Sequence, residues 1–272
     1  MSLLEIKTLP TAAETQGYFA PLAVVATVLT GIGLLWSGVD NRMVGEAEAW
    51  VKPVKFAASF ALLFATLALV ERRFSAPVRT GWVLWGIAMV MAAAFSAEMG
   101  YIGYQAARAE ASHYNFSTPF HAFMYATVMG GGAVALVGSI AATGWVARQD
   151  KGARLGDATR AGIWWGFLLS GVLTLIVAGV LSNGPGHHIG LHPAGAPTLP
   201  LFGWSGVTGD LRPAHFVALH AMQVLPLLGL WLDRRGAAGG VRTVQLAAIG
   251  YCALTLAIFV QALMGWPLIP LG

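Results

Sequence analysis

Seven apolar runs, each long enough to cross a lipid bilayer, constrain this chain more than any other feature. A hydrocarbon core about 30 Å thick needs about 20 apolar residues in a helix. Runs of this kind lie near positions 18–39, 53–70, 80–105, 119–147, 160–181, 213–232 and 242–265. No internal repeat or low-complexity segment divides them. We therefore expect one all-α domain over residues 1–272, a polytopic membrane bundle of seven transmembrane helices.

The composition fits a membrane protein and excludes several other classes. Only 10% of the residues are charged and 57% are hydrophobic, whereas a soluble domain carries about 25% charged residues. The single cysteine, Cys252, excludes an internal disulfide and a thiolate metal site. The net charge of +4 does not indicate nucleic-acid binding, because the basic residues form short clusters between the apolar runs.

The basic residues also predict how the helices are oriented. With seven spans, the N-terminus and every second loop share one side, and that side holds eleven of the sixteen Lys and Arg residues. The positive-inside rule then predicts a cytoplasmic N-terminus and an outer C-terminus. The first run is expected to stay as an anchor, because the N-terminus lacks the pattern of a signal peptide.

The outer side is expected to carry the chemistry, because all the histidines fall in outer loops or in the outer part of a span. They are His113, His121, His187, His188, His192, His215 and His220. The segment at 182–210, between the fifth and sixth spans, is long and rich in Gly and Pro. Loops of this length are often functional, and this composition predicts a structured outer cap.

Two lysines mark the start of the second span. Lys52 and Lys55 are three residues apart and therefore share a helix face. Cations at a helix N-terminus oppose the macrodipole, which favours anions there. Two interpretations follow: the lysines snorkel to the membrane interface, or they bind an anionic group such as a propionate, a phosphate or a carboxylate.

A polar stripe runs down the third span. Glu98, Tyr101, Gln105 and Arg108 follow one another at steps of three, four and three residues, so they share one side of a helix. A carboxylate inside a membrane is a functional hypothesis by default. The alternative is that Glu98 pairs with a basic residue, such as Lys55 or Arg212, for helix packing.

The stretch GDLRPAHFVALHAMQVLPL at the sixth span is the most specific. Asp210 is expected to be the N-cap of this helix, with Pro213 in the first turn. About 140° separates His215 from His220 around a helix, so we expect them to serve two neighbouring sites, or to lie one inside the bundle and one under the loop cap. Gln223 lies one turn beyond His220 on the same face. A core histidine satisfied by a hydrogen bond is the alternative for each.

Three segments resemble a family of uncharacterised bacterial seven-span membrane proteins: WVKPVKF (50–56), QAARAEASHYN (105–115) and GDLRPAHFVALHAMQVLPL (209–227). The likeness covers roughly residues 20–232 and implies a seven-helix fold. Its pattern includes Lys52, Lys55, Gln105, Arg108, His113, His188, Asp210, Arg212, His215, His220 and Gln223. His121, His187 and His192 do not match that pattern, and the resemblance implies no function. We expect a bacterial inner-membrane protein with its functional face outside.

The first functional hypothesis is a membrane redox protein with a His-ligated transition metal or b-type haem near the outer, periplasmic face. A quinone or a small hydrophobic or anionic substrate would be its partner, beside the lipid bilayer. The candidate metal ligands are His113, His188, His215 and His220. The candidate cofactor-binding residues are Lys52, Lys55, Gln105, Arg108 and Arg212. The candidate catalytic residues are Glu98, Asp210 and Gln223.

Two other classes stay open. In a metal-dependent hydrolase or transferase acting on a lipid-like substrate, histidines and Asp210 would hold zinc and Glu98 would act as general base. In a transporter, sensor or assembly protein without a metal, Glu98 and the lysines would form a proton or anion path. The visible spectrum and metal content of the purified protein discriminate among the three.

Overall fold

The computed structural model describes residues 17–45, 47–184 and 186–271, and it is an all-α bundle with seven helices of membrane-spanning length and hydropathy. The spans are α2 (Phe19–Ser37), α3 (Val51–Glu71), α5 (Trp82–Ala107), the α6–η1–α7 span (Pro119–Gln149), α8 (Asp157–Asn183), α9 (Arg212–Arg234) and α10 (Gly240–Leu263). No end differs from the expected boundary by more than three residues. The expected all-α class is therefore confirmed. Lys7, which contributes to the predicted orientation, lies outside the described residues.

The fourth span is not one uniform helix. It begins as α6 (Pro119–Phe123), continues as the π-helical segment η1 (Met124–Gly131) and ends as α7 (Gly132–Gln149). The hydroxyl of Thr118 caps its start by accepting a hydrogen bond of 3.2 Å from the His121 N–H. Hydropathy predicts one continuous span here, because it does not distinguish a π-helix from an α-helix. Short π-helical segments often occur at functional sites.

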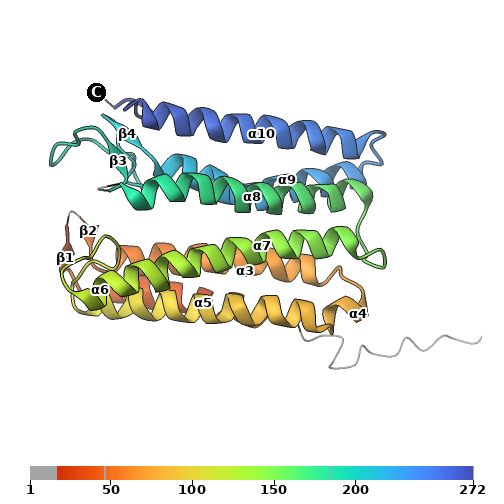
Figure 1. Ribbon diagram of the computed structural model, residues 1–272, viewed down its shortest axis with the longest axis horizontal. Coiled ribbons are helices and arrows are strands. Elements are labelled where there is room, and N and C mark those ends of the chain that lie inside the picture. Colours follow the sequence, from red (N-terminus) through yellow and green to blue (C-terminus); the bar gives the residue numbers. More distant parts are fainter. Residues whose placement is uncertain (1–16, 46, 185, 272) are drawn as a thin grey trace, which may run out of the picture.

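Glycines set the tightest helix contact. A Cβ atom at Gly162 of α8 would overlap the carbonyl of Leu225, and one at Gly229 of α9 would overlap the carbonyl of Ala158. Only glycine permits so close an approach of α8 and α9, as in other membrane bundles packed through small residues. In Figure 1, α8, α9 and α10 lie together in one group, and α3, α5 and α7 lie in a second group below them.

The two ends of the bundle differ. We call the segments between α2 and α3, α5 and α6, and α8 and α9, with the residues after α10, the loop end. Among the described residues, the opposite end, the short-turn end, carries the start of α2, the turns between spans and α4 (Ala76–Arg79). The four strands of the described residues lie at the loop end (Figure 1): β1 (Met43–Val44), β2 (Ala47–Glu48), β3 (His188–Ile189) and β4 (Gly209–Asp210). The strands pair as two antiparallel hairpins, β1 with β2 and β3 with β4.

Carboxylates fasten the helices at the short-turn end. Glu71 of α3 accepts hydrogen bonds from the N–H groups of Tyr18 and Phe19 at 2.8 and 3.2 Å. Asp233 of α9 does the same for Ala158 and Thr159 at the start of α8, at 3.1 and 2.7 Å. The first N–H groups of a helix have no partner within it, so these acids satisfy them and favour the helix dipole.

Candidate functional site

The segment between α8 and α9 folds into a cap over the loop end. Its two ends pair as β3 and β4, and an isolated bridge joins Thr198 to Ser205. The N–H of Leu211 donates to the His187 carbonyl at 3.0 Å, which closes the hairpin. This backbone pairing brings His188 opposite Asp210, 22 residues further along the chain.

Asp210 is the buried centre of this cap, with 2% of its surface exposed. Its carboxylate accepts hydrogen bonds from the Arg212 guanidinium, at 2.9 Å to Oδ1 and 2.6 Å to Oδ2, and from the Ser205 N–H at 2.9 Å. Burial alone would raise the pKa of Asp210, but the hydrogen bonds and charge of Arg212 outweigh it and lower the pKa. The carboxylate is therefore ionised and firmly oriented.

The expectation that Asp210 is the N-cap of the sixth span is wrong. Leu211 occupies that position, and Asp210 belongs to β4 because its backbone pairs with His188. The carboxylate still reaches the start of α9, where Oδ1 accepts the Arg212 N–H at 3.0 Å.

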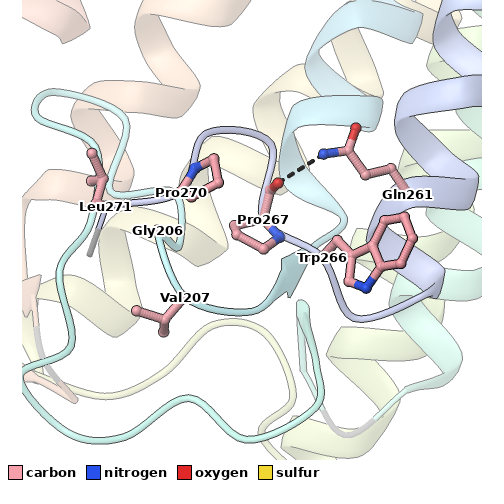
Figure 2. Close-up of a pocket in the computed structure, with 7 residues that line it drawn as sticks. All are labelled: Gly206, Val207, Gln261, Trp266, Pro267, Pro270 and Leu271. Atoms are coloured by element: carbon pink, nitrogen blue, oxygen red, sulfur yellow. Dashed lines mark hydrogen bonds between the residues drawn. The ribbon is translucent and has the colours of Figure 1, made fainter.

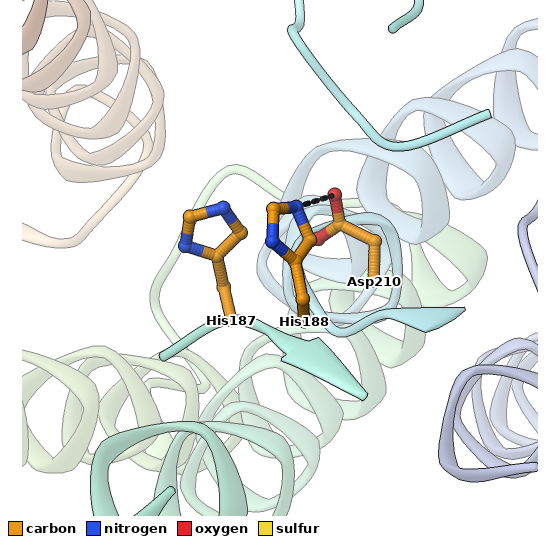
Figure 3. Close-up of side chains that lie close together, drawn as sticks. All are labelled: His187, His188 and Asp210. Atoms are coloured by element: carbon orange, nitrogen blue, oxygen red, sulfur yellow. Dashed lines mark ion pairs between the residues drawn. The ribbon is translucent and has the colours of Figure 1, made fainter. Parts of the chain in front are cut away.

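Two adjacent histidines stand beside this carboxylate (Figure 3). His188 Nε2 lies 3.9 Å from Asp210 Oδ2, and one ligand atom each from His187, His188 and Asp210 lies within 4.8 Å of the others. The His192 ring stacks on His188 with 4.0 Å between centroids. Burial and then the charge of Arg212 lower the pKa of His187 to about 4. His187 is therefore neutral at pH 7, the form in which imidazole binds a metal.

The structure brings one of the four predicted metal ligands, His188, into this cluster, and adds His187, which the resemblance had set aside. His215 and His220 lie together on the first turns of α9. His220 Nδ1 is 2.6 Å from the Phe216 carbonyl, as a hydrogen-bonded core histidine would be. His215 Nδ1 is buried and has no hydrogen-bond partner among residues 17–45, 47–184 and 186–271.

The fourth predicted metal ligand, His113, lies between aromatic rings. Its centroid is 5.5 Å from that of Phe56 and 5.7 Å from that of Tyr125. Burial, followed by the charge of Lys52, lowers the pKa of His113 to about 3. The imidazole is therefore a neutral member of an aromatic cluster.

The predicted cationic residues separate into two groups. Lys55 donates to the Phe202 carbonyl at 3.3 Å, and Arg212 donates to the next carbonyl, that of Gly203, at 2.6 Å. These two cations hold the cap down on α3 and α9. Lys52 instead lies 5.9 Å from the Phe56 ring centre, and Arg108 pairs with Glu110 at 2.8 Å.

The polar stripe of the third span turns inward, as its spacing predicts, for three of its four members. Glu98, Tyr101 and Gln105 are buried, whereas Arg108 is exposed because α5 ends just before it. Within the described part of the chain, no ion pair joins Glu98 to Lys55 or Arg212, and its Oε1 has no hydrogen-bond partner.

The two predicted glutamines make contacts that link segments of the fold. Gln105 donates to the Ala111 carbonyl at 2.9 Å and so holds the segment after α5. Gln223 of α9 donates to the Thr66 hydroxyl of α3 at 3.1 Å. Each side-chain oxygen is buried without a hydrogen-bond partner that the structure describes.

One hollow at this end is lined mainly by apolar residues. It has a volume of about 600 Å³ and lies between the cap and the residues after α10 (Figure 2), where Gln261 donates to the Pro267 carbonyl at 2.8 Å. The N–H of Leu271 donates to the Gly206 carbonyl at 2.9 Å. No residue that lines the hollow is titratable. The residues after α10 therefore support the cap, and the hollow offers no group for acid–base chemistry.

No protein-family model, curated protein or solved structure matches this chain. The candidate site therefore rests on the geometry and chemistry of its own residues, and His187, His188 and Asp210 form its centre.

Proposed function

We propose that this integral membrane protein is a redox protein that binds a transition-metal ion through His187, His188 and Asp210. The observation that carries the proposal is the convergence of three ligand atoms within 4.8 Å on one hairpin. Two imidazoles and one carboxylate, with other positions left open, are typical of non-haem iron(II) sites in oxygen chemistry. The same donors also bind zinc or copper, so the metal that binds decides the chemistry.

The surroundings of the three donors support metal binding. His187 is neutral and Asp210 is ionised, so neither has to lose a proton to a medium at pH 7 before it binds. Arg212 and the Ser205 N–H orient the carboxylate by donating to Oδ2, the oxygen that also faces His188, as outer partners of metal ligands commonly do. Because Arg212 shares Asp210 with the metal, we expect weaker binding than at a carboxylate without a cationic partner.

The spacing of the rings favours a single ion over haem at this place. The ring centroids of His187 and His188 are 4.1 Å apart, and those of His188 and His192 are 4.0 Å apart. Two rings so close leave no room for a macrocycle between them. A mononuclear ion needs only the three donor atoms and open positions for water, oxygen or substrate.

The orientation in the membrane is part of the same proposal. The bases of the short-turn end, such as Arg72, Arg148, Arg154 and Arg234, favour that end for the cytoplasm. The metal site would then face outward from a bacterial inner membrane. A reporter that is active only outside the cytoplasm, fused after residue 272, should be active, and an inactive fusion beside an active cytoplasmic reporter contradicts this orientation.

Metal titration of the detergent-purified protein, after chelator treatment, tests the proposal. We expect one equivalent of iron(II) to bind, measured by elemental analysis and calorimetry. The double variant His187→Ala/His188→Ala should lose about 100-fold or more in affinity, since it removes two of three ligands. His220→Ala is the matched control: it removes a histidine of the same end that faces the Phe216 carbonyl, and it should bind as the wild type does.

Three results would overturn the proposal in distinct ways. A protein that binds no divalent metal contradicts the site itself. Equal loss in His220→Ala and in the double variant places the metal elsewhere. Stoichiometric zinc with no affinity for iron or copper removes the redox role and favours hydrolysis of a lipid-like substrate, the chemistry of zinc with an open position for water.

A further inference from the structure

A row of neighbouring polar side chains lies at the loop end, outside the histidine cluster of the cap. The Tyr101 hydroxyl of α5 is 3.1 Å from His121 Nδ1 of α6. On the other side of the same ring, His121 Nε2 is 3.5 Å from Glu110 Oε2. Arg108 holds the other carboxylate oxygen of Glu110, with 2.8 Å between Nη2 and Oε1. Neither the sequence patterns nor the proposed metal site involves His121.

Donors and acceptors alternate along this row of polar side chains. The hydrogen bonds from Arg108 lower the pKa of Glu110, so its carboxylate is ionised and accepts only. In the neutral tautomer that carries its proton on Nε2, facing Glu110, His121 accepts the hydrogen bond of the Tyr101 hydroxyl at Nδ1. The Tyr101 oxygen keeps free lone-pair capacity, so a further group that meets it must bring an O–H or N–H.

A groove lies beside Tyr101, between α5 and the α6–η1 segment. It has a volume of about 400 Å³. Small residues, such as Ala97 and Gly100, form one part of its lining, and the rings of Tyr104 and Phe120, each more than half exposed, form another. No charged residue lines it. Tyr104 and Phe120 are exposed on the outside of the bundle, so in a bilayer spanned by α5 a ligand would reach the groove from the lipid phase.

We propose that this groove binds the head group of a lipid-soluble hydroquinone, whose hydroxyl donates a hydrogen bond to the Tyr101 oxygen. The aromatic rings of Tyr104 and Phe120 suit a flat ring, for which offset or edge-on contacts are favourable. The cation nearest the groove, Arg108, lies 5.5 Å from the Tyr104 ring centre and is already paired with Glu110, which disfavours a phospholipid head group because its phosphate would lose water without gaining an unpaired cation. The site is separate from His187, His188 and Asp210, and it does not require the metal.

Two probes with the same tail and ring test the assignment on the detergent-purified protein. One is a short-tailed quinol kept reduced, and the other is its dimethyl ether, which lacks both hydroxyl groups. Calorimetric or fluorescence titration should give affinity about fivefold or more higher for the quinol, the effect of one hydrogen bond. The ether partitions into micelles more strongly than the quinol, so each affinity is corrected for the measured micelle partition of its probe, and the remaining difference reports the hydroxyl.

Three variants locate the effect. Tyr101→Phe should abolish the preference for the quinol, whereas Tyr104→Phe removes a hydroxyl in the same groove and should keep it. Gly100→Leu should block both probes, and it should fold normally because no atom lies within 4 Å of a Cβ built there. Equal binding of the two probes to the wild type, or an unchanged preference in Tyr101→Phe, overturns the proposal. Undiminished binding to Gly100→Leu overturns it as well.

Discussion

Carboxylate groups have different partners at the two ends of this bundle. At the short-turn end, Glu71, Asp150 and Asp233 each accept hydrogen bonds from backbone N–H groups, and two of them fasten the first turn of a helix. At the loop end, Glu110 and Asp210 pair with an arginine and also face a histidine. The first arrangement satisfies backbone groups of the fold, whereas the second places a charged carboxylate beside an imidazole, as the proposed metal site requires.

Buried polar atoms without a hydrogen-bond partner occur toward both ends of the bundle in the described chain, and Arg79 Nε is one at the short-turn end. Toward the loop end, Glu98 Oε1, Gln105 Oε1 and His215 Nδ1 are buried without a hydrogen-bond partner among the described residues. Each such atom costs stability, by about 1–3 kcal/mol. Proteins commonly break the rules of stability at functional sites and compensate for it elsewhere. The acid-capped helices of the short-turn end provide such compensation.

The largest effect on stability is expected from the short-turn end. Asp233→Ala removes two hydrogen bonds to the start of α8 and one from the Thr159 hydroxyl. We expect a loss of about 3 kcal/mol, because hydrogen bonds to charged groups contribute about 1.5–3 kcal/mol. The thermal midpoint in detergent should fall by about 6–12 °C.

Two controls accompany that variant. Asp233→Asn keeps an acceptor oxygen and should lose less stability than Asp233→Ala. Metal affinity at the loop end should be the same in both, measured on folded protein. A change in metal affinity would show that the two ends do not divide stability and ligand binding between them.

A smaller effect, dependent on pH, is expected from His113. Its pKa in the folded protein is about 3, below its ordinary value of 6.5, so the unfolded chain binds a proton that the folded chain does not. Stability is therefore fully present above pH 6.5 and is lost as the pH falls toward 3. Between pH 6.5 and pH 5 the loss is about 2 kcal/mol.

The matched variant for this effect is His113→Phe, whose ring can occupy the place between Phe56 and Tyr125. Its thermal midpoint should fall less steeply than that of the wild type between pH 6.5 and pH 5. Identical slopes for the two proteins would mean that His113 takes up its proton in the folded state.

The spans were predictable because their signal is local. The length and hydropathy of a run decide whether it crosses a bilayer, and the steps from Glu98 to Gln105 place those residues on one buried face. The π-helical turn of η1 was not predictable, since its residues have the same hydropathy as an α-helix would. Arg108 left the stripe because α5 ends at Ala107.

Only part of the candidate site was predictable from the sequence. Its geometry depends on the path of the cap between α8 and α9, whose residues follow neither a helical nor a strand periodicity. His188 and Asp210 meet through the β3–β4 pairing, which no spacing in the sequence indicates. His187 and His121 were set aside because they do not match the resembling family. The structure nevertheless places them beside Asp210 and Tyr101. Residues that match the resembling family therefore indicate where a site lies better than they indicate which residues form it.

The smallest expected effect has the opposite sign. Glu98 is buried against Gly132, and its Oε1 has no hydrogen-bond partner within the described chain. Glu98→Met replaces the carboxyl group with an apolar group of similar length, so the thermal midpoint in detergent should rise by about 2–4 °C, or about 1 kcal/mol. Glu98→Gln keeps a buried polar group and should bring no such gain. A lower midpoint for Glu98→Met would show that Glu98 stabilises the fold, as the acids of the short-turn end do, and the contrast between the ends would then not extend into the membrane.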